Sequence, residues 1–199
     1  MTSPKQQYFD KRAEALVKNL QSRHFGACYC ATKEDALEKA LQLIPEGSKV
    51  GWGGAASAQE IGLLQALEEG NWDAVGRNTA GGVDVFVTGA NALSMDGEMV
   101  NIDGLGNRIS AIIYGPKTVV VIAGMNKVMD SLEDAITRAR TVAAPINMQR
   151  FGKNTPCAVT GVCHDCKSED CICNHIVITR HGRPTGRIQF VLVGEDLGF

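Results

Sequence analysis

The sequence predicts an α/β protein whose largely parallel sheet is covered by helices on both faces. Two observations lead to this prediction. Nearly uncharged, β-branched runs recur along the chain, most clearly at 84–88 (DVFVT) and 118–123 (TVVVIA), as expected for strands that are buried on both faces. Between such runs lie segments of roughly 10 to 15 residues in which apolar side chains recur at helical spacing.

The first quarter of the chain alternates helix and strand. Residues 8–23 carry an apolar stripe on one side and polar residues on the other, which predicts an amphipathic helix. A loosely alternating strand follows over 26–31. Thr32 is then placed to cap a helix with a buried face of alanine, leucine and isoleucine. After a Pro-Glu-Gly turn, residues 49–53 predict a short buried strand.

The remaining elements continue this alternation. Ser57, with Glu60 three residues later, predicts a capping box that opens the next helix. Ser131 predicts the cap of a long helix that runs to about Ala144. The last predicted strand covers 187–194 (RIQFVLVG).

We expect one domain over residues 1–199, because this length suits one full-sized α/β domain and the sequence shows no internal repeat or linker. Residues 148–174 have no helical or strand periodicity and contain five of the seven cysteines. This segment is therefore predicted to be an irregular excursion that its cysteines hold together.

Composition argues against two classes of partner. Twenty Lys and Arg against 22 Asp and Glu give a formal net charge of −2, so the chain lacks the strong positive field of a general nucleic-acid binder. No apolar run approaches the roughly 20 residues that span a bilayer, and the N-terminus has no apolar core of a secretory signal. We expect a cytoplasmic protein with no membrane insertion.

Three glycine-rich segments follow predicted strands, where open α/β sheets bind their ligands. In the first, Gly53 and Gly54 permit close backbone approach, and the helix that begins near Ser57 offers N–H groups to an anion. A tight strand–helix connection is the alternative. In the second, Thr88 and Asn91 carry side chains that can hydrogen-bond a ligand, although Asn91 can equally close a turn.

The third segment, over 101–108, is the richest in chemistry. Asp103 could act as a base or bind a ligand hydroxyl, and Arg108 could clamp a carboxylate or phosphate with two parallel hydrogen bonds. These two are the candidate catalytic residues. The alternative is that the Asn, Asp and Gly residues of this segment simply form a tight turn, which they favour. The further candidate ligand-binding residues here are Asn101, Gly104, Gly106 and Asn107.

The cysteines indicate metal or redox chemistry, because they are dense in a chain that has a large apolar core. Their number is odd, so complete disulfide pairing within one chain is impossible. The spacing Cys157-x5-Cys163-x2-Cys166-x6-Cys173 can supply four thiolates to zinc or to a [4Fe–4S] cluster. We favour zinc, because a structural zinc site with four protein ligands could hold an irregular segment together. Unligated thiols are the alternative.

Several motifs, taken in order, carry a family resemblance. TGANA, DGE, NIDGLGNR, YGPK and GMNK are followed by PCAVTGVCHDCKSEDCIC and by LVGEDLGF. Together they resemble the lactate-utilisation (LUD) domain family, especially its short bacterial members, over the chain from about Tyr8. The family commonly has Arg where this chain has Cys171, which makes Cys171 either a spare thiol or a substitute ligand.

The resemblance implies a fold similar to the NagB/RpiA/CoA-transferase-like α/β class and a part in bacterial lactate oxidation to pyruvate beside iron–sulfur subunits. Two functions stay open. One is an accessory or catalytic component that binds a small anionic or phosphorylated metabolite. The other is a non-catalytic, metal-binding assembly or electron-transfer partner of an iron–sulfur redox subunit. The chain has no complete catalytic set, so its being an enzyme is left open, as is a homo-oligomer.

Overall fold

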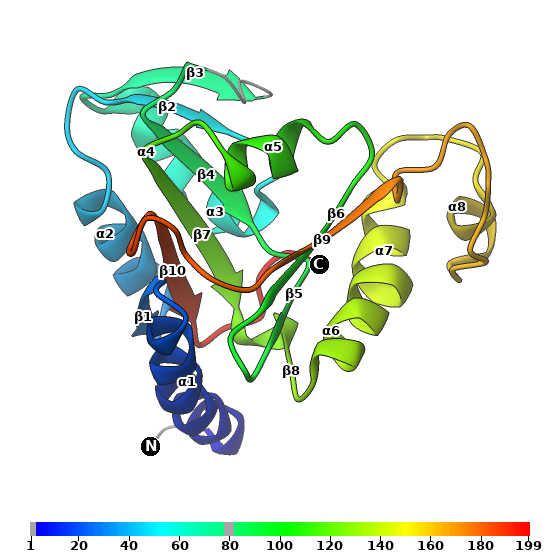
Figure 1. Cartoon of the computed structure of the whole chain (residues 1–199), viewed down its shortest axis with the longest axis horizontal. Coiled ribbons are helices and arrows are strands. Elements are labelled where there is room, and N and C mark those ends of the chain that lie inside the picture. The colour runs from blue at the N-terminus through cyan, green and yellow to red at the C-terminus, as the bar shows by residue number, and fades with distance from the viewer. Residues whose placement is uncertain (1–2, 78–81) are drawn as a thin grey trace.

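The structure is a computed structural model that describes residues 3–77 and 82–199, and within these ranges six parallel strands form the larger sheet (Figure 1). The α/β fold with a parallel central sheet is therefore confirmed. In spatial order the strands are β1 (Gly26–Cys30), β10 (Ile188–Val193), β7 (Thr118–Gly124), β4 (Val85–Gly89), β2 (Lys49–Trp52) and β3 (Asp73–Arg77).

Strands β4 and β7 lie in the middle of this sheet and carry its core. Every residue of β4 is buried, and so is every residue of β7 after Thr118. Alternate side chains of β7 point to opposite faces, so Val119 and Val121 belong to one apolar cluster while Val120 and Ile122 belong to another. Two buried faces explain the uninterrupted apolar runs in the sequence.

One face of the sheet is covered by α2 (Lys33–Gln42), α3 (Ala56–Glu60) and α4 (Leu63–Glu69). The Thr32 cap is confirmed, because its Oγ1 accepts a hydrogen bond from the backbone N–H of Asp35. The capping box expected at Ser57 is wrong. Helix α3 begins after Ala55 without a side-chain cap, and Gly62, at φ +80°, separates α3 from α4. The Ser57 hydroxyl is instead buried in contact with a lysine.

The opposite face is covered by α1 (Pro4–Ser22), α5 (Asn107–Ile113) and a second, smaller sheet that the sequence did not predict. Leu93, Met99 and Val128 of this sheet pack in the same cluster as Phe86 and Phe190 of the central sheet. In spatial order its strands are β8 (Val128–Met129), β5 (Ala92–Ser94), β6 (Met99–Asp103) and β9 (His175–Thr179).

The predicted helix after Ser131 is interrupted. Its cap is confirmed, with Ser131 Oγ accepting from the N–H of Asp134. Helix α6 (Leu132–Arg138) then widens into a π-helical turn, η2 (Ala139–Ala143), before α7 (Ala144–Met148). Helix α6 packs on the outer face of the smaller sheet.

The cysteine-rich segment 148–174 is irregular as expected, apart from the short helix α8 (Pro156–Thr160). Figure 1 shows α8 and its loops at one end of the molecule, beyond α7. The seven cysteines, all within the described ranges, are free thiols. No helix in those ranges combines the length and the hydropathy needed to cross a bilayer.

Candidate functional site

Strands β2, β4 and β7 are parallel, so their carboxyl ends meet at one edge of the central sheet. A cavity of about 540 Å³, which we name the strand-end cavity, opens there. It collects side chains and glycines from all three predicted segments. The predicted residues that line it are Gly54, Asn91, Asp103, Gly104, Asn107 and Arg108.

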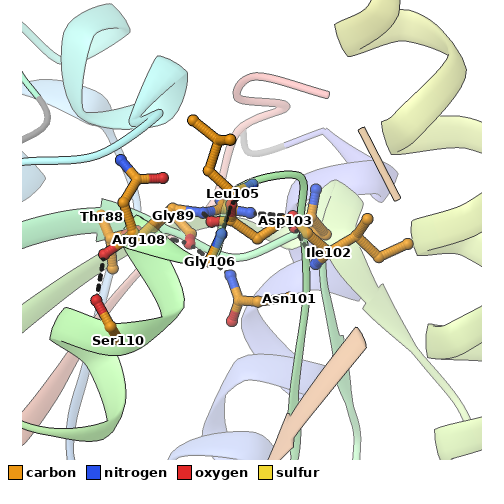
Figure 2. A network of polar contacts seen from close by, with 11 residues as sticks. Thr88, Gly89, Asn101, Ile102, Asp103, Leu105, Gly106, Arg108 and Ser110 are labelled. Carbon is orange, nitrogen blue, oxygen red and sulfur yellow. Dashed lines mark hydrogen bonds and ion pairs between the residues drawn. The ribbon is translucent and has the colours of Figure 1, made fainter. Parts of the chain in front are cut away.

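The loop after β6 is closed by Asp103. Its Oδ1 accepts hydrogen bonds from the backbone N–H groups of Leu105 (3.1 Å) and Gly106 (2.9 Å), and Gly106 adopts φ +86° to start α5. Its Oδ2 lies 3.4 Å from Nε of Arg108 (Figure 2). Asp103 therefore closes the turn and also pairs with the arginine that follows it.

Arg108 is held against β6 and against Asn91, two residues after β4. Its Nη2 donates to Oδ1 of Asn91 at 2.9 Å and to the carbonyl of Ile102 at 2.5 Å. Burial lowers the pKa of Arg108 and the nearby Asp103 opposes this shift, but an arginine stays charged. Gly53 makes room for the side chain, because a Cβ there would lie 2.8 Å from Cγ of Arg108.

Lys127, which was not among the predicted site residues, also lines the cavity. It ends the 3₁₀ turn η1 (Met125–Lys127) that follows β7, and it is only 3% exposed. Its Nζ donates to Oγ of Ser57 at 2.9 Å and to the carbonyl of Ala90 at 3.3 Å. Among residues 3–77 and 82–199 it forms no ion pair.

The surroundings of Lys127 disfavour its charged form. Burial lowers the pKa of Lys127 to about 8; the positive charges of Arg138 and Arg108 act in the same direction, whereas Glu60 opposes them. Arg138, on α6, is 8% exposed and donates to two backbone carbonyls, those of Asn126 (3.2 Å) and Asn91 (2.5 Å). Burial lowers its pKa as well.

Three other predicted residues lie behind the cavity wall. Ser57 is 1% exposed and supports Lys127, while its hydroxyl faces the carbonyl of Leu197 at 3.4 Å. Thr88 and Asn101 are buried, and each donates to the carbonyl of Gly89 at 3.2 Å. In the described part of the chain, Oδ1 of Asn101 is a buried oxygen without a hydrogen-bond partner.

The far wall of the cavity comes from the end of the cysteine-rich segment and from the last residues of the chain. Asn174 donates to the carbonyl of Gly104 at 3.1 Å, which ties this wall to the Asp103 loop. Lys153 pairs with Asp170 at 2.6 Å. Phe199 lines the cavity below the guanidinium of Arg150, 5.7 Å from its ring centre.

Five cysteines line a second cavity of about 260 Å³, the cysteine cavity. Burial and three neighbouring thiols raise the pKa of Cys173. Within the described ranges, no three His, Cys, Asp or Glu side chains are close enough together to hold one metal ion. The two cavities share Ala144, Cys171 and Ile172 as a wall. The cysteines of the cysteine cavity are Cys157, Cys163, Cys166, Cys171 and Cys173.

A signal for Lys127 was present in the sequence. It follows the clearest buried strand by three residues, at the same edge as the three glycine-rich segments, so the rule that selected those segments also applies to it. Arg138 offers no such signal, because it stands within a helix where an arginine is ordinarily exposed.

Two comparisons with known proteins agree with this architecture. The model of the LUD domain family matches residues 13–193. The crystal structure of a DUF162 family protein from Deinococcus radiodurans, at 1.70 Å resolution, is similar over 97% of this chain and 99% of that chain, with a TM-score of 0.55 and 11% sequence identity. At that identity the likeness shows the fold alone. No curated protein matches this chain.

Proposed function

Because this chain belongs to the LUD domain family, which suggests a role related to lactate utilisation, we propose that its strand-end cavity binds a small anionic metabolite. One observation carries the proposal. Lys127 and Arg138 are buried, the Arg108 side chain beside them is 14% exposed, and Asp103 is the carboxylate that pairs with Arg108. A buried charge without a counter-charge costs several kcal/mol, so an anion that enters here relieves that cost.

The size and lining of the cavity suit such a ligand. Its volume of about 540 Å³ falls among small-molecule sites, which typically measure about 300–1,000 Å³. Arg150 adds positive charge on the far wall, where Lys153 is paired with Asp170 and Glu169 is the other acidic residue. The cations that the cavity offers to a carboxylate or a phosphate are therefore Arg108 and Lys127, with Arg150 on the far wall.

The contacts also assign roles to the predicted catalytic pair. Both oxygens of Asp103 are engaged, by two backbone N–H groups and by Arg108. These contacts support a positioning role for Asp103 rather than a role as general base. Arg108, fixed by Asp103 and Asn91, is preorganised to meet an anion with little loss of side-chain entropy.

Calorimetric titration with lactate, pyruvate and inorganic phosphate tests this proposal. At least one should bind the wild type, and Arg108→Lys should weaken binding by roughly tenfold or more, since lysine keeps the charge but loses the planar fork. Arg12→Lys is the matched control, because Arg12 pairs with Asp130 on the surface. If none of the three anions bound, or if both variants bound as the wild type does, the proposal would fail.

A second candidate function is supported by the cysteine cavity. Five thiols facing one small cavity are the right donors for zinc or for an iron–sulfur cluster, although segment 156–174 would have to draw inward before four of them could bind one ion. Bound zinc would supply a structural staple, and a cluster would supply electron transfer to an iron–sulfur partner. Cys157, Cys163, Cys166 and Cys173 are the proposed ligands, with Cys171 beside them.

Elemental analysis and a visible spectrum of anaerobically purified protein test the metal. Serine at any of the four proposed ligands should lower the metal content, serine at Cys171 should lower it least, and Cys28→Ser on β1 should leave it unchanged. A brown protein indicates a cluster, whereas a colourless protein with about one zinc per chain indicates the staple. A metal-free protein would contradict this candidate.

A further inference from the structure

We propose that Lys127 is a nucleophilic amine that forms an imine with a small aldehyde or ketone bearing an anionic group. This proposal rests on the proposed function, because the anionic group is what Arg108 and its neighbours would hold. It adds the chemical class of the ligand and a covalent role for one residue.

The amine of Lys127 lies at the cavity, and the Ser57 hydroxyl that helps to orient it lies behind the cavity wall. Lys127 lines the strand-end cavity, whereas Ser57, which accepts its hydrogen bond at 2.9 Å, does not. Two contacts, to Ser57 and to the carbonyl of Ala90, fix the direction of Nζ. Ser57 is thus a positioning residue, and Lys127 is the nucleophile that a ligand can reach.

The anion-binding arginine stands next to this amine. Lys127 contacts the carbonyl of Ala90, and Arg108 contacts the side chain of the following residue, Asn91. Both cations line the same cavity. A ligand of a few atoms that rests its carboxylate or phosphate on Arg108 therefore has its carbonyl carbon on the side of Lys127.

The charges around Lys127 favour the neutral amine that nucleophilic attack requires. Arg138 on α6 and Arg108 on α5 lower its pKa together with burial, and Glu60 on α3 is the opposing acid. With a pKa of about 8, roughly one amine in ten is neutral at pH 7, against roughly one in 2,500 for an ordinary lysine. Burial and adjacent cations are the two devices by which proteins activate imine-forming lysines.

The reaction balances without an external oxidant or reductant. The lone pair of Nζ forms a bond to the carbonyl carbon while the C=O π pair moves to oxygen, and a proton passes from nitrogen to that oxygen. The resulting hydroxyl takes a second proton from solvent and leaves as water while the nitrogen lone pair forms the C=N bond; the protonated imine can then return its N–H proton to solvent. Hydride from borohydride, when added as a trap, reduces this bond to a stable secondary amine.

Borohydride trapping on the intact protein tests the proposal, with glyoxylate and glycolaldehyde phosphate as anionic probes and acetaldehyde as the probe without an anion. Peptide mass spectrometry locates the adduct. We expect Lys127 to be labelled by one of the anionic probes at concentrations that leave surface lysines such as Lys39 unlabelled, and its labelling rate to rise with pH to a midpoint near 8. Arg108→Lys should lower labelling at Lys127.

The outcomes separate the two proposals. If calorimetry shows anion binding but no adduct forms on Lys127, the imine is refuted and the anion site stands. If acetaldehyde labels Lys127 as fast as the anionic probes do, the amine is reactive but the anion site is refuted. Labelling of Lys127 no faster than of Lys39 would refute the activated amine. Lys127→Gln, which folds without a buried charge, should keep its structure by circular dichroism and lose the adduct.

Discussion

Alanine at Gly53 tests how the glycine-rich loop positions Arg108. The added Cβ would lie 2.8 Å from Cγ and 3.0 Å from Cδ of Arg108, much closer than atoms in contact. Arg108 is largely enclosed, with 14% of its side chain exposed, and cannot move aside without losing its hydrogen bonds to Asn91 and to the carbonyl of Ile102. Overpacking costs about 1–3 kcal/mol, and a lost charged hydrogen bond costs a similar amount, so we expect Gly53→Ala to lower the free energy of unfolding by about 2–4 kcal/mol.

The neighbouring glycine is a matched control. A Cβ at Gly54 would have no atom of another residue within 4 Å. Gly54→Ala should therefore change the free energy of unfolding by less than about 0.5 kcal/mol. Urea denaturation followed by tryptophan fluorescence measures both variants, because Trp52 is buried one residue before Gly53.

A double-mutant cycle identifies the cause of the loss. In an Arg108→Ala background the two closest atoms are gone and only Cβ of residue 108, at 3.2 Å, remains, so adding Gly53→Ala should cost less than about 1 kcal/mol. An equal cost in the presence and absence of Arg108 would refute the reasoning, because the strain would then lie in the backbone of the loop. Anion binding should be lost in Gly53→Ala and in Arg108→Ala alike.

Three further variants have definite expectations. Lys127→Met should raise the free energy of unfolding at pH 7, because it removes a buried charge. Between about pH 8 and 10.5 the unfolded wild type binds more protons than the folded one, so wild-type stability should rise with pH. The stability advantage of Lys127→Met over the wild type should therefore shrink across that window, as measured by urea denaturation. Ser131→Ala should cost about 1 kcal/mol by urea denaturation, whereas Ser22→Ala, which removes no cap, should cost much less. Asn174→Ala, which removes the bond to Gly104, should weaken anion binding by calorimetry more than it lowers stability.

The central sheet and its flanking helices could be predicted from the sequence, and the smaller sheet could not. Runs such as TVVVIA show strands buried on both faces directly, and caps such as Thr32 depend only on residues three positions apart. Strands β5 and β8 have three and two residues, too few to show a period, and their pairing is set by packing on the central sheet.

The site shows the same division between local and distant contacts. Asp103 and Arg108 could be predicted because they stand only five residues apart, at the end of β6 and the start of α5, and the rule for strand ends brought Asn91 to them. Ser57 was selected for the wrong reason, since its hydroxyl meets Lys127, 70 residues away, rather than its own helix. Lys127 and Arg138 are significant because they are buried without an ion pair to any residue that the structure describes, and this is a property of the folded chain that no local sequence pattern records.

The position of Phe199 has a practical consequence for handling the protein. It lines the strand-end cavity, and a Cβ on the preceding Gly198 would lie 3.0 Å from Nζ of Lys127. An affinity tag fused after Phe199 would therefore emerge at the mouth of the cavity, where it would compete with ligands or block the trapping reagent. Figure 1 shows the start of α1 well away from the C-terminus, so a purification tag belongs at the N-terminal end.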